Sequence, residues 1–293
     1  MLNFMKTPEH DLILSNGVKV KYRPFLVKEE KILLMSVENN VEQEMVDTLI
    51  KTVQTCVLTD GVDVTKLPVY DFEWLWLNIR SKSIGETVQL KLKCPDDETQ
   101  VVDYDFNIES VKPDFSKKIN THVPFSKDYG VIMKVPTIIE VSNKKTIIDL
   151  TVNLMRDCIA QIYNGDEVFE TKDLEPKELE QFVDNLTMPQ FKKLKDFFEQ
   201  LPIISHTIKY KNPKSGVEHE MLLQGASDFF SVTLLHESLE SFYRTNFALM
   251  QYHKYSLGDL EGMLPWEREI YVDLLLQHIR EENEKIREKQ RGR

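Results

Sequence analysis

The chain has little cysteine for its length and no apolar stretch long enough to cross a bilayer. Its three cysteines stand at positions 56, 94 and 158, and no two of them form a C-x-x-C pair. Three cysteines cannot all pair, so we expect small buried thiols in a reducing compartment. No apolar run approaches the roughly 20 residues of a membrane helix, and the N-terminus lacks the basic start and apolar core of a signal peptide. We therefore expect a soluble cytosolic chain that does not act at a membrane.

Motifs that carry chemistry are also missing. None of the ten glycines lies in a GxxxxGK phosphate loop, and no GxSxG nucleophile motif occurs. His236-Glu237 resembles the start of an HExxH zinc helix, but position 240 is Glu rather than His. Paired carboxylates such as Asp103 with Asp105 are typical of solvated faces. The sequence predicts no enzyme, no catalytic residue and no cofactor.

The chain has fewer basic than acidic residues, and this limits the kinds of partner that it can bind. The chain has 37 Lys and Arg against 48 Asp and Glu, a formal net charge of −11. Binding to nucleic acid through phosphate contacts requires clustered Lys and Arg. We therefore expect protein partners and no nucleic acid.

What is present predicts an α+β fold that is mainly helical, with short β-hairpins and a helical C-terminal part. Asn16-Gly17 between two apolar runs predicts a hairpin with a primed turn. Apolar residues at helical spacing predict helices, and alternating residues predict two further hairpins. Asp71 is the expected cap of one helix, Ser256 of another, and Pro265 is expected to open the last. The predicted helices cover about 26–37, 41–58, 71–84, 147–163, 174–186, 188–201 and the segment from Gly225 onward; the hairpin strands cover 87–93 with 101–108, and 206–211 with 218–223.

Two segments of the chain resemble each other, which indicates internal duplication. Leu90-Lys-Leu-Lys-Cys-Pro95 matches Ile208-Lys-Tyr-Lys-Asn-Pro213 after a shift of 118 positions, and helical segments precede both. The repeated unit is helix, helix, hairpin. The predicted regions are an N-terminal hairpin with the first unit (1–112), an extended connection (113–145), the second unit (146–225) and a C-terminal helical region (226–293).

The hairpin around Cys94 looks like a zinc ribbon without its second cysteine. A structural zinc site needs four ligands, and neither hairpin has even a pair of cysteines. Cys94 and His219 would have to come together from different copies of the unit. We therefore expect no metal ligands, and hairpins held by packing and hydrogen bonds.

Aromatic residues beside arginine are the candidates for a partner interface. Trp and Arg dominate binding hot spots because they bury large areas and make several directed contacts. The alternative is that the tryptophans of residues 71–84 belong to a fully enclosed core helix, and that Trp266 packs between domains. The candidate interface residues are Trp74, Trp76, Arg80, Trp266 and Arg268.

Several stretches resemble one known family. EWLWLNIRSKSIGE, LKLKCP, the DFF at 228–230 and LPWEREIYVDLL at 264–275 are similar to segments of the baseplate hub assembly proteins of T-even-type contractile-tailed bacteriophages. In that family the hairpins resemble ribbon-like knuckles with paired cysteines, a pattern from which this chain departs at Asn212. The resemblance implies a viral protein, made in the host cytoplasm, that helps to form the hub beside hub and tape-measure proteins.

Two alternatives to a non-enzymatic hub adaptor remain open. One is a cell-wall hydrolase of the tail tip, for which Glu237, Glu267 and Glu269 are the carboxylates to test. The other is a tape-measure chaperone that is absent from the virion. Whether the protein stays in the tail baseplate and whether it is oligomeric within the hub are open as well.

Overall fold

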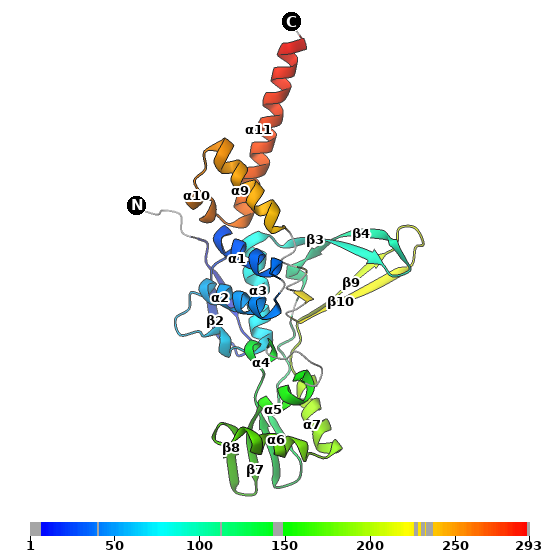
Figure 1. Ribbon diagram of the computed structural model, residues 1–293. Helices are drawn as coiled ribbons and strands as arrows, with labels where there is room; N and C mark the ends of the chain where they lie inside the picture. The colour runs from blue at the N-terminus through cyan, green and yellow to red at the C-terminus, as the bar shows by residue number, and fades with distance from the viewer. Residues whose placement is uncertain are drawn as a thin grey trace.

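The computed structural model describes residues 7–39, 41–111, 113–142, 149–225, 228, 229, 232 and 237–291. Figure 1 shows four parts: a central helical body, a small lobe below it, an arm of two hairpins to one side, and a C-terminal unit above. Helices predominate and every sheet is antiparallel. The predicted α+β class with short hairpins and a helical C-terminal part is confirmed.

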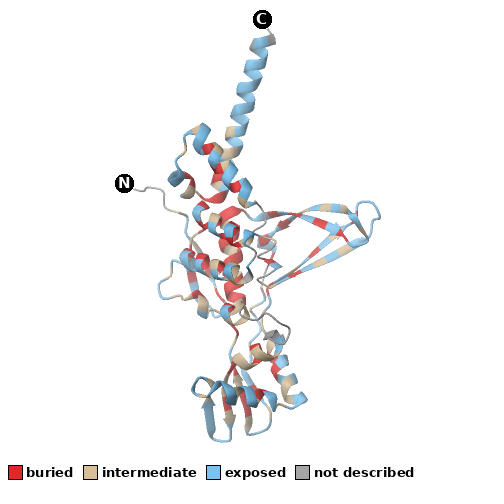
Figure 2. Ribbon diagram, in the orientation of Figure 1, coloured by how far each residue is buried: buried red, intermediate tan, exposed pale blue. Residues whose placement is uncertain are grey.

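The body is built around helix α3 (Val69–Ile84), which other elements enclose. The predicted hairpin around Asn16-Gly17 is confirmed, but its turn is not the predicted primed one. Gly17 has a φ of 81°, whereas Asn16 does not have the positive φ that a primed turn with these two central residues requires. Figure 2 shows how continuous burial is along α3. The other elements of the body are β1 (His10–Ile13), β2 (Lys19–Tyr22), α1 (Val27–Glu38), α2 (Glu42–Cys56) and α4 (Ile138–Ser142).

Helix α3 is buried around most of its circumference. Trp76 is 1% exposed and stacks on Phe25 at a centroid distance of 6.0 Å. Asp71 does not cap the helix as predicted, because α3 begins at Val69 after Pro68. Its carboxylate instead accepts hydrogen bonds from the backbone N–H and the hydroxyl of Ser15, at 2.8 and 2.7 Å. Burial raises the pKa of Asp71 despite these two donors.

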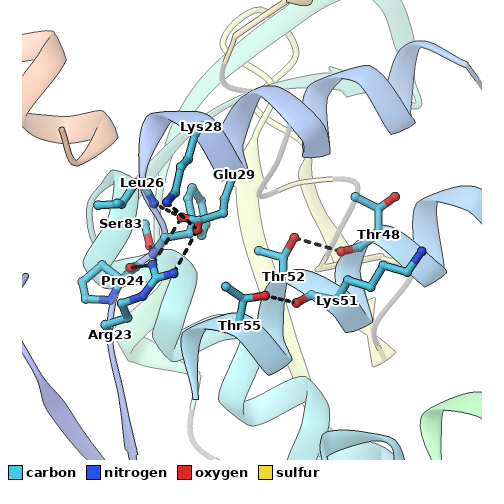
Figure 3. Close-up of polar contacts among 11 residues, drawn as sticks. Arg23, Pro24, Leu26, Lys28, Glu29, Thr48, Lys51, Thr52, Thr55 and Ser83 are labelled. Atoms are coloured by element: carbon cyan, nitrogen blue, oxygen red, sulfur yellow. Dashed lines mark hydrogen bonds and ion pairs between the residues drawn. The ribbon is translucent and has the colours of Figure 1, made fainter. Parts of the chain in front are cut away.

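A polar cluster fixes the start of α1 against α3 (Figure 3). Arg23 forms an ion pair with Glu29 at 2.9 Å, and Glu29 also accepts from the backbone N–H of Leu26, which precedes the helix. The hydroxyl of Ser83 accepts from the N–H of Phe25 at 2.8 Å. Each buried polar group in this cluster therefore has a partner, as burial requires.

The small lobe packs three helices on a four-stranded sheet of order β5-β6-β7-β8. Val131 faces Ile162 across β6 and β7, and the core is completed by Leu194 and Phe197, both fully buried. Its elements are β5 (His122–Pro124), β6 (Tyr129–Met133), β7 (Ile159–Asn164), β8 (Glu167–Glu170), α5 (Leu154–Asp157), α6 (Pro176–Asp184) and α7 (Met188–Glu199).

Two local predictions fail in this lobe. The helix predicted over 147–163 consists of a π-helical turn at Asp149–Asn153 and α5, which ends at Asp157; residues 147 and 148 lie outside the described residues. The chain then enters strand β7, because β6 and β8 supply hydrogen-bonding partners on both sides. The segment 113–145, expected to be an extended connection, contains β5, β6 and α4.

The arm consists of the two hairpins that the alternating residues predicted. They are β3 (Thr87–Cys94) with β4 (Asp97–Asn107), and β9 (Ser205–Lys211) with β10 (Glu218–Gln224). Lys91 lies opposite Asp103 across the first pair, which places unlike charges side by side. Two helices precede each hairpin, α2 and α3 before the first and α6 and α7 before the second, and the predicted second unit (146–225) also contains α5, β7 and β8.

The C-terminal unit is helical, with α9 (Leu239–His253), α10 (Leu257–Glu261) and α11 (Pro265–Arg291). Ser256 caps α10 and Pro265 opens α11, as predicted. The helical segment predicted from Gly225 is described in full only from Leu239; Phe230 and His236 lie outside the described residues. Among the helices that the structure describes, none combines the length and apolar character of a membrane span.

Candidate functional site

A buried ion network attaches the C-terminal unit to the body. The guanidinium of Arg268 on α11 is 3.3 Å from Glu30 of α1 and 2.5 Å from Glu237, and it donates to Asn246 of α9 at 3.3 Å. It also lies 4.6 Å from the ring centre of Phe242. Arg268 is 3% exposed, so these contacts lie in the interior of the protein. They connect α11 with α1 and α9.

Helix α9 has an apolar surface that none of the described residues covers. Phe242, Asn246 and Leu249 form its buried side. On another side, Tyr243, Phe247 and Met250 follow each other at steps of four and three residues, and they are 50%, 61% and 40% exposed. We call these three residues the α9 face. Aromatic and methionine side chains exposed together on one helix side are typical of a binding surface.

Helix α11 also carries exposed apolar residues where it leaves the body (Figure 1). Val272 and Leu275, on the same side as Arg268, are half-buried. Ile279 and Ile286 continue that side and are 36% and 50% exposed. The steps of three, four and seven residues match one side of a helix that packs along another helix.

The structure does not bring the five predicted interface residues together on one surface. Trp76 and Arg80 are each 1% exposed inside the body, and Arg80 donates to the carbonyl oxygen of Gly85. Arg268 is the buried centre of the ion network described above. Trp74 is half-buried beside the main core, and Trp266 is 36% exposed. For Trp76 the structure agrees with the alternative reading, a fully enclosed core helix.

The carboxylates of the hydrolase alternative are spread over different roles. Glu237 is ion-paired with Arg268. Glu267 accepts from the backbone N–H of Leu264 at the start of α11, at 3.0 Å. Glu237 and Glu269 border one shallow depression between α9 and α11, together with Arg268. A carboxylate held by a buried arginine supports the fold rather than proton transfer to a substrate.

The sequence failed to predict that the tips of the two hairpins meet. The hydroxyl of Tyr210 donates to the carbonyl oxygen of Lys93 at 2.9 Å, and Lys214 forms an ion pair with Asp97 at 3.2 Å. Asp96 accepts from the side-chain amide of Asn212 at 2.9 Å. We call this contact between residues 93–97 and 210–219 the hairpin junction.

Asp96 is the centre of the hairpin junction. Its carboxylate also accepts from the hydroxyl of Ser215 at 2.5 Å and lies 2.6 Å from Nε2 of His219. The hydrogen bonds from Ser215 and Asn212 are the main causes that hold the pKa of Asp96 well below its usual range. Cys94, expected to lie apart from His219, is buried at the same place. The 118-residue repeat was the sequence signal that these two turns are equivalent, but it did not predict their contact.

Comparison with protein families gives two matches that together cover most of the chain. The model described as T4 bacteriophage base plate protein matches residues 5–231, which include the body, the small lobe and the arm. The model described as Baseplate hub assembly protein Gp51 C-terminal domain matches residues 234–279, which include the α9 face. No curated protein and no solved structure gives a significant match.

Proposed function

The chain belongs to the T4 bacteriophage base plate protein family, and on this premise we propose that it is a non-enzymatic assembly factor that docks a baseplate hub component on its α9 face. The match of residues 234–279 to a hub assembly domain supports a role in phage baseplate assembly and contact with hub components. Beyond that match, we propose that the contact is made on the α9 face and that the chain catalyses no reaction.

The observation that carries the proposal is the exposure of Tyr243, Phe247 and Met250 within the hub assembly domain. None of the three is needed to cover the body, because Phe242 on another side of α9 packs against Val27 and Leu34 of α1. Covering one large apolar side chain contributes about 1.5–3 kcal/mol relative to leaving it in water. Three such residues on one helix side therefore suit a partner with an apolar groove or helix.

The arrangement of the four parts supports the role of adaptor rather than enzyme. The arm, the small lobe and α11 extend from the body in different directions (Figure 1), so each offers a separate surface. We propose the hub proteins and the tape-measure protein as the partners, bound in the host cytoplasm while the tail is assembled. Nucleic acid is not among the proposed partners, since the net charge is −11.

The test is a substitution on the α9 face with a matched control on the small lobe. Phe247→Asp places a charge where the partner is proposed to cover an apolar ring, and we expect it to abolish co-elution with co-expressed hub proteins in size-exclusion chromatography. Phe169→Asp changes another exposed phenylalanine, 44% exposed on β8, and is expected to leave co-elution intact. Elution of the unmodified chain by itself at every ratio of hub protein would contradict the proposal.

A second measurement separates an assembly factor from a permanent part of the tail. Quantitative mass spectrometry of purified tails is expected to find this chain well below the stoichiometry of the hub proteins. Cell-wall substrate incubated with the purified chain is expected to show no turnover. Recovery at hub stoichiometry would replace the assembly factor with a structural subunit, and measurable turnover would contradict the non-enzymatic role.

A further inference from the structure

The hairpin junction brings three metal-binding side chains together from two distant segments. Cys94 ends β3, Asp96 lies in the turn that follows, and His219 lies on β10. One ligand atom of each, a sulfur, a carboxylate oxygen and a ring nitrogen, lies within 4.8 Å of the other two. Among the described residues, no other three potential metal ligands lie this close together.

We propose that Cys94, Asp96 and His219 bind a divalent cation of the zinc class, which joins the two hairpins. A thiolate, an imidazole and a carboxylate form a mixed S, N, O donor set that suits zinc or cobalt, whereas calcium and magnesium prefer oxygen ligands alone. The ligand set differs from the paired cysteines of a zinc ribbon, because two of the three ligands are not cysteine.

The surroundings of the three ligands suit a site with one open position. Asn212, which stands where the repeat places a counterpart of Cys94, uses its side-chain oxygen to accept from the backbone N–H groups of Lys214 and Ser215, at 2.8 and 3.2 Å. That oxygen is therefore occupied, and water is the natural fourth ligand. Asn212 and Ser215 donate to Asp96 and fix the direction of its carboxylate.

Binding requires a small local opening and the release of protons. Nε2 of His219 and Oδ1 of Asp96 are 2.6 Å apart, in direct hydrogen-bond contact. Two ligands of a tetrahedral zinc ion, each about 2.0–2.1 Å from it, are about 3.3 Å apart. The ion therefore takes the place of the proton between them and moves the imidazole and the carboxylate apart by less than 1 Å. Cys94 loses its thiol proton to solvent on binding, so affinity rises with pH.

The experiment uses the full chain, stripped of metal with a chelator and titrated with Co²⁺. A thiolate bound to Co²⁺ gives a charge-transfer absorption band in the near ultraviolet, and we expect one equivalent of Co²⁺ to saturate it and Zn²⁺ to remove it. Cys94→Ser is expected to abolish the band. His219→Gln is expected to weaken binding by more than the 10–100-fold that loss of an outer hydrogen-bonding partner costs.

The matched control is Cys158→Ala, which removes a buried cysteine of the small lobe and leaves the junction intact. It is expected to keep the band at full intensity. Far-ultraviolet circular dichroism checks that each variant is folded. The proposal is overturned if the folded, metal-free chain shows no thiolate band at millimolar Co²⁺, or if the band persists in Cys94→Ser.

Discussion

The two long helices α3 and α11 show opposite relations between a helix and its surroundings. Twelve of the sixteen residues of α3 are buried, whereas among the described side chains of α11 only Pro265 and Arg268 are. Both helices carry apolar side chains on more than one side. Enclosure by α1, α2 and the arm makes α3 a core element, while α11 leaves the body after one or two turns (Figure 2). Neighbours, rather than apolar content alone, decide which helix stabilises the fold.

The largest effect is expected from a truncation in α3. Phe72 is fully buried in the main core, so Phe72→Ala is expected to lower the free energy of unfolding by about 3–5 kcal/mol, since it removes apolar contacts and leaves a cavity. Chemical denaturation followed by circular dichroism measures the change. A loss below 1 kcal/mol would mean that the body is not a close-packed core.

The next largest effect is expected at the contact between the body and the C-terminal unit. Arg268→Ala removes the buried guanidinium that is ion-paired with Glu30 and Glu237 and is expected to cost about 3 kcal/mol. The loss should be concentrated in the C-terminal unit, which amide hydrogen exchange resolves. Faster exchange in α9 and α11 with unchanged exchange in the small lobe is the expected pattern. Equal acceleration in both would show that the network stabilises the whole molecule instead.

A smaller effect is expected when the pH is lowered, and it differs between Asp96 of the arm and Asp71 of the body. The folded-state pKa of Asp96 is depressed, so its stabilising contribution is present above the ordinary value of about 3.9 and fades as the pH falls below it. The pKa of Asp71 is raised by burial, so its protonation on acidification favours the folded state. Carbon NMR of the carboxyl groups is expected to show Asp71 titrating at higher pH than Asp96.

A control variant sharpens this pH comparison. Ser215→Ala removes the first of the hydrogen bonds that depress the pKa of Asp96, so the titration of Asp96 is expected to move to higher pH while that of Asp71 stays unchanged. The reverse order of the two titrations in the unmodified chain would contradict the assigned causes.

The smallest effect is expected on the far side of α11. Leu274 is 57% exposed, so Leu274→Ala is expected to change the free energy of unfolding by no more than about 0.5 kcal/mol. The same denaturation experiment as for Phe72→Ala measures it. A loss above 2 kcal/mol would mean that another copy of the chain covers α11 in solution, which analytical ultracentrifugation would detect.

Local patterns predicted much of the fold. The spacing of apolar residues in α2, the alternation in β3 and the hairpin signal at Asn16-Gly17 depend on near neighbours in sequence. The helix, the strand and the hairpin all formed, although the turn of the hairpin is not of the predicted primed type. Residues 159–163 were predicted helical because their apolar residues also fit a helix, and pairing with β6 and β8 makes them part of strand β7. Here a long-range partner overrode the local preference.

The candidate site was harder to predict because it depends on contacts between distant residues. Trp76 and Arg80 have the composition of a hot spot, but which side of a helix the rest of the chain covers is not encoded locally. Cys94 and His219 lie 125 positions apart, and their meeting depends on the relative placement of two hairpins. The α9 face was within a predicted helical segment, but its exposure required the whole unit.

The length of α11 beyond the body has a consequence for how far its residues can move. A helix of 27 residues is about 40 Å long, and this one is fixed only near its first two turns. A small tilt of α11 where it leaves the body therefore displaces its free end by a much larger distance. Ile279 and Ile286 lie on this projecting part, so the same tilt displaces them further than Val272 and Leu275.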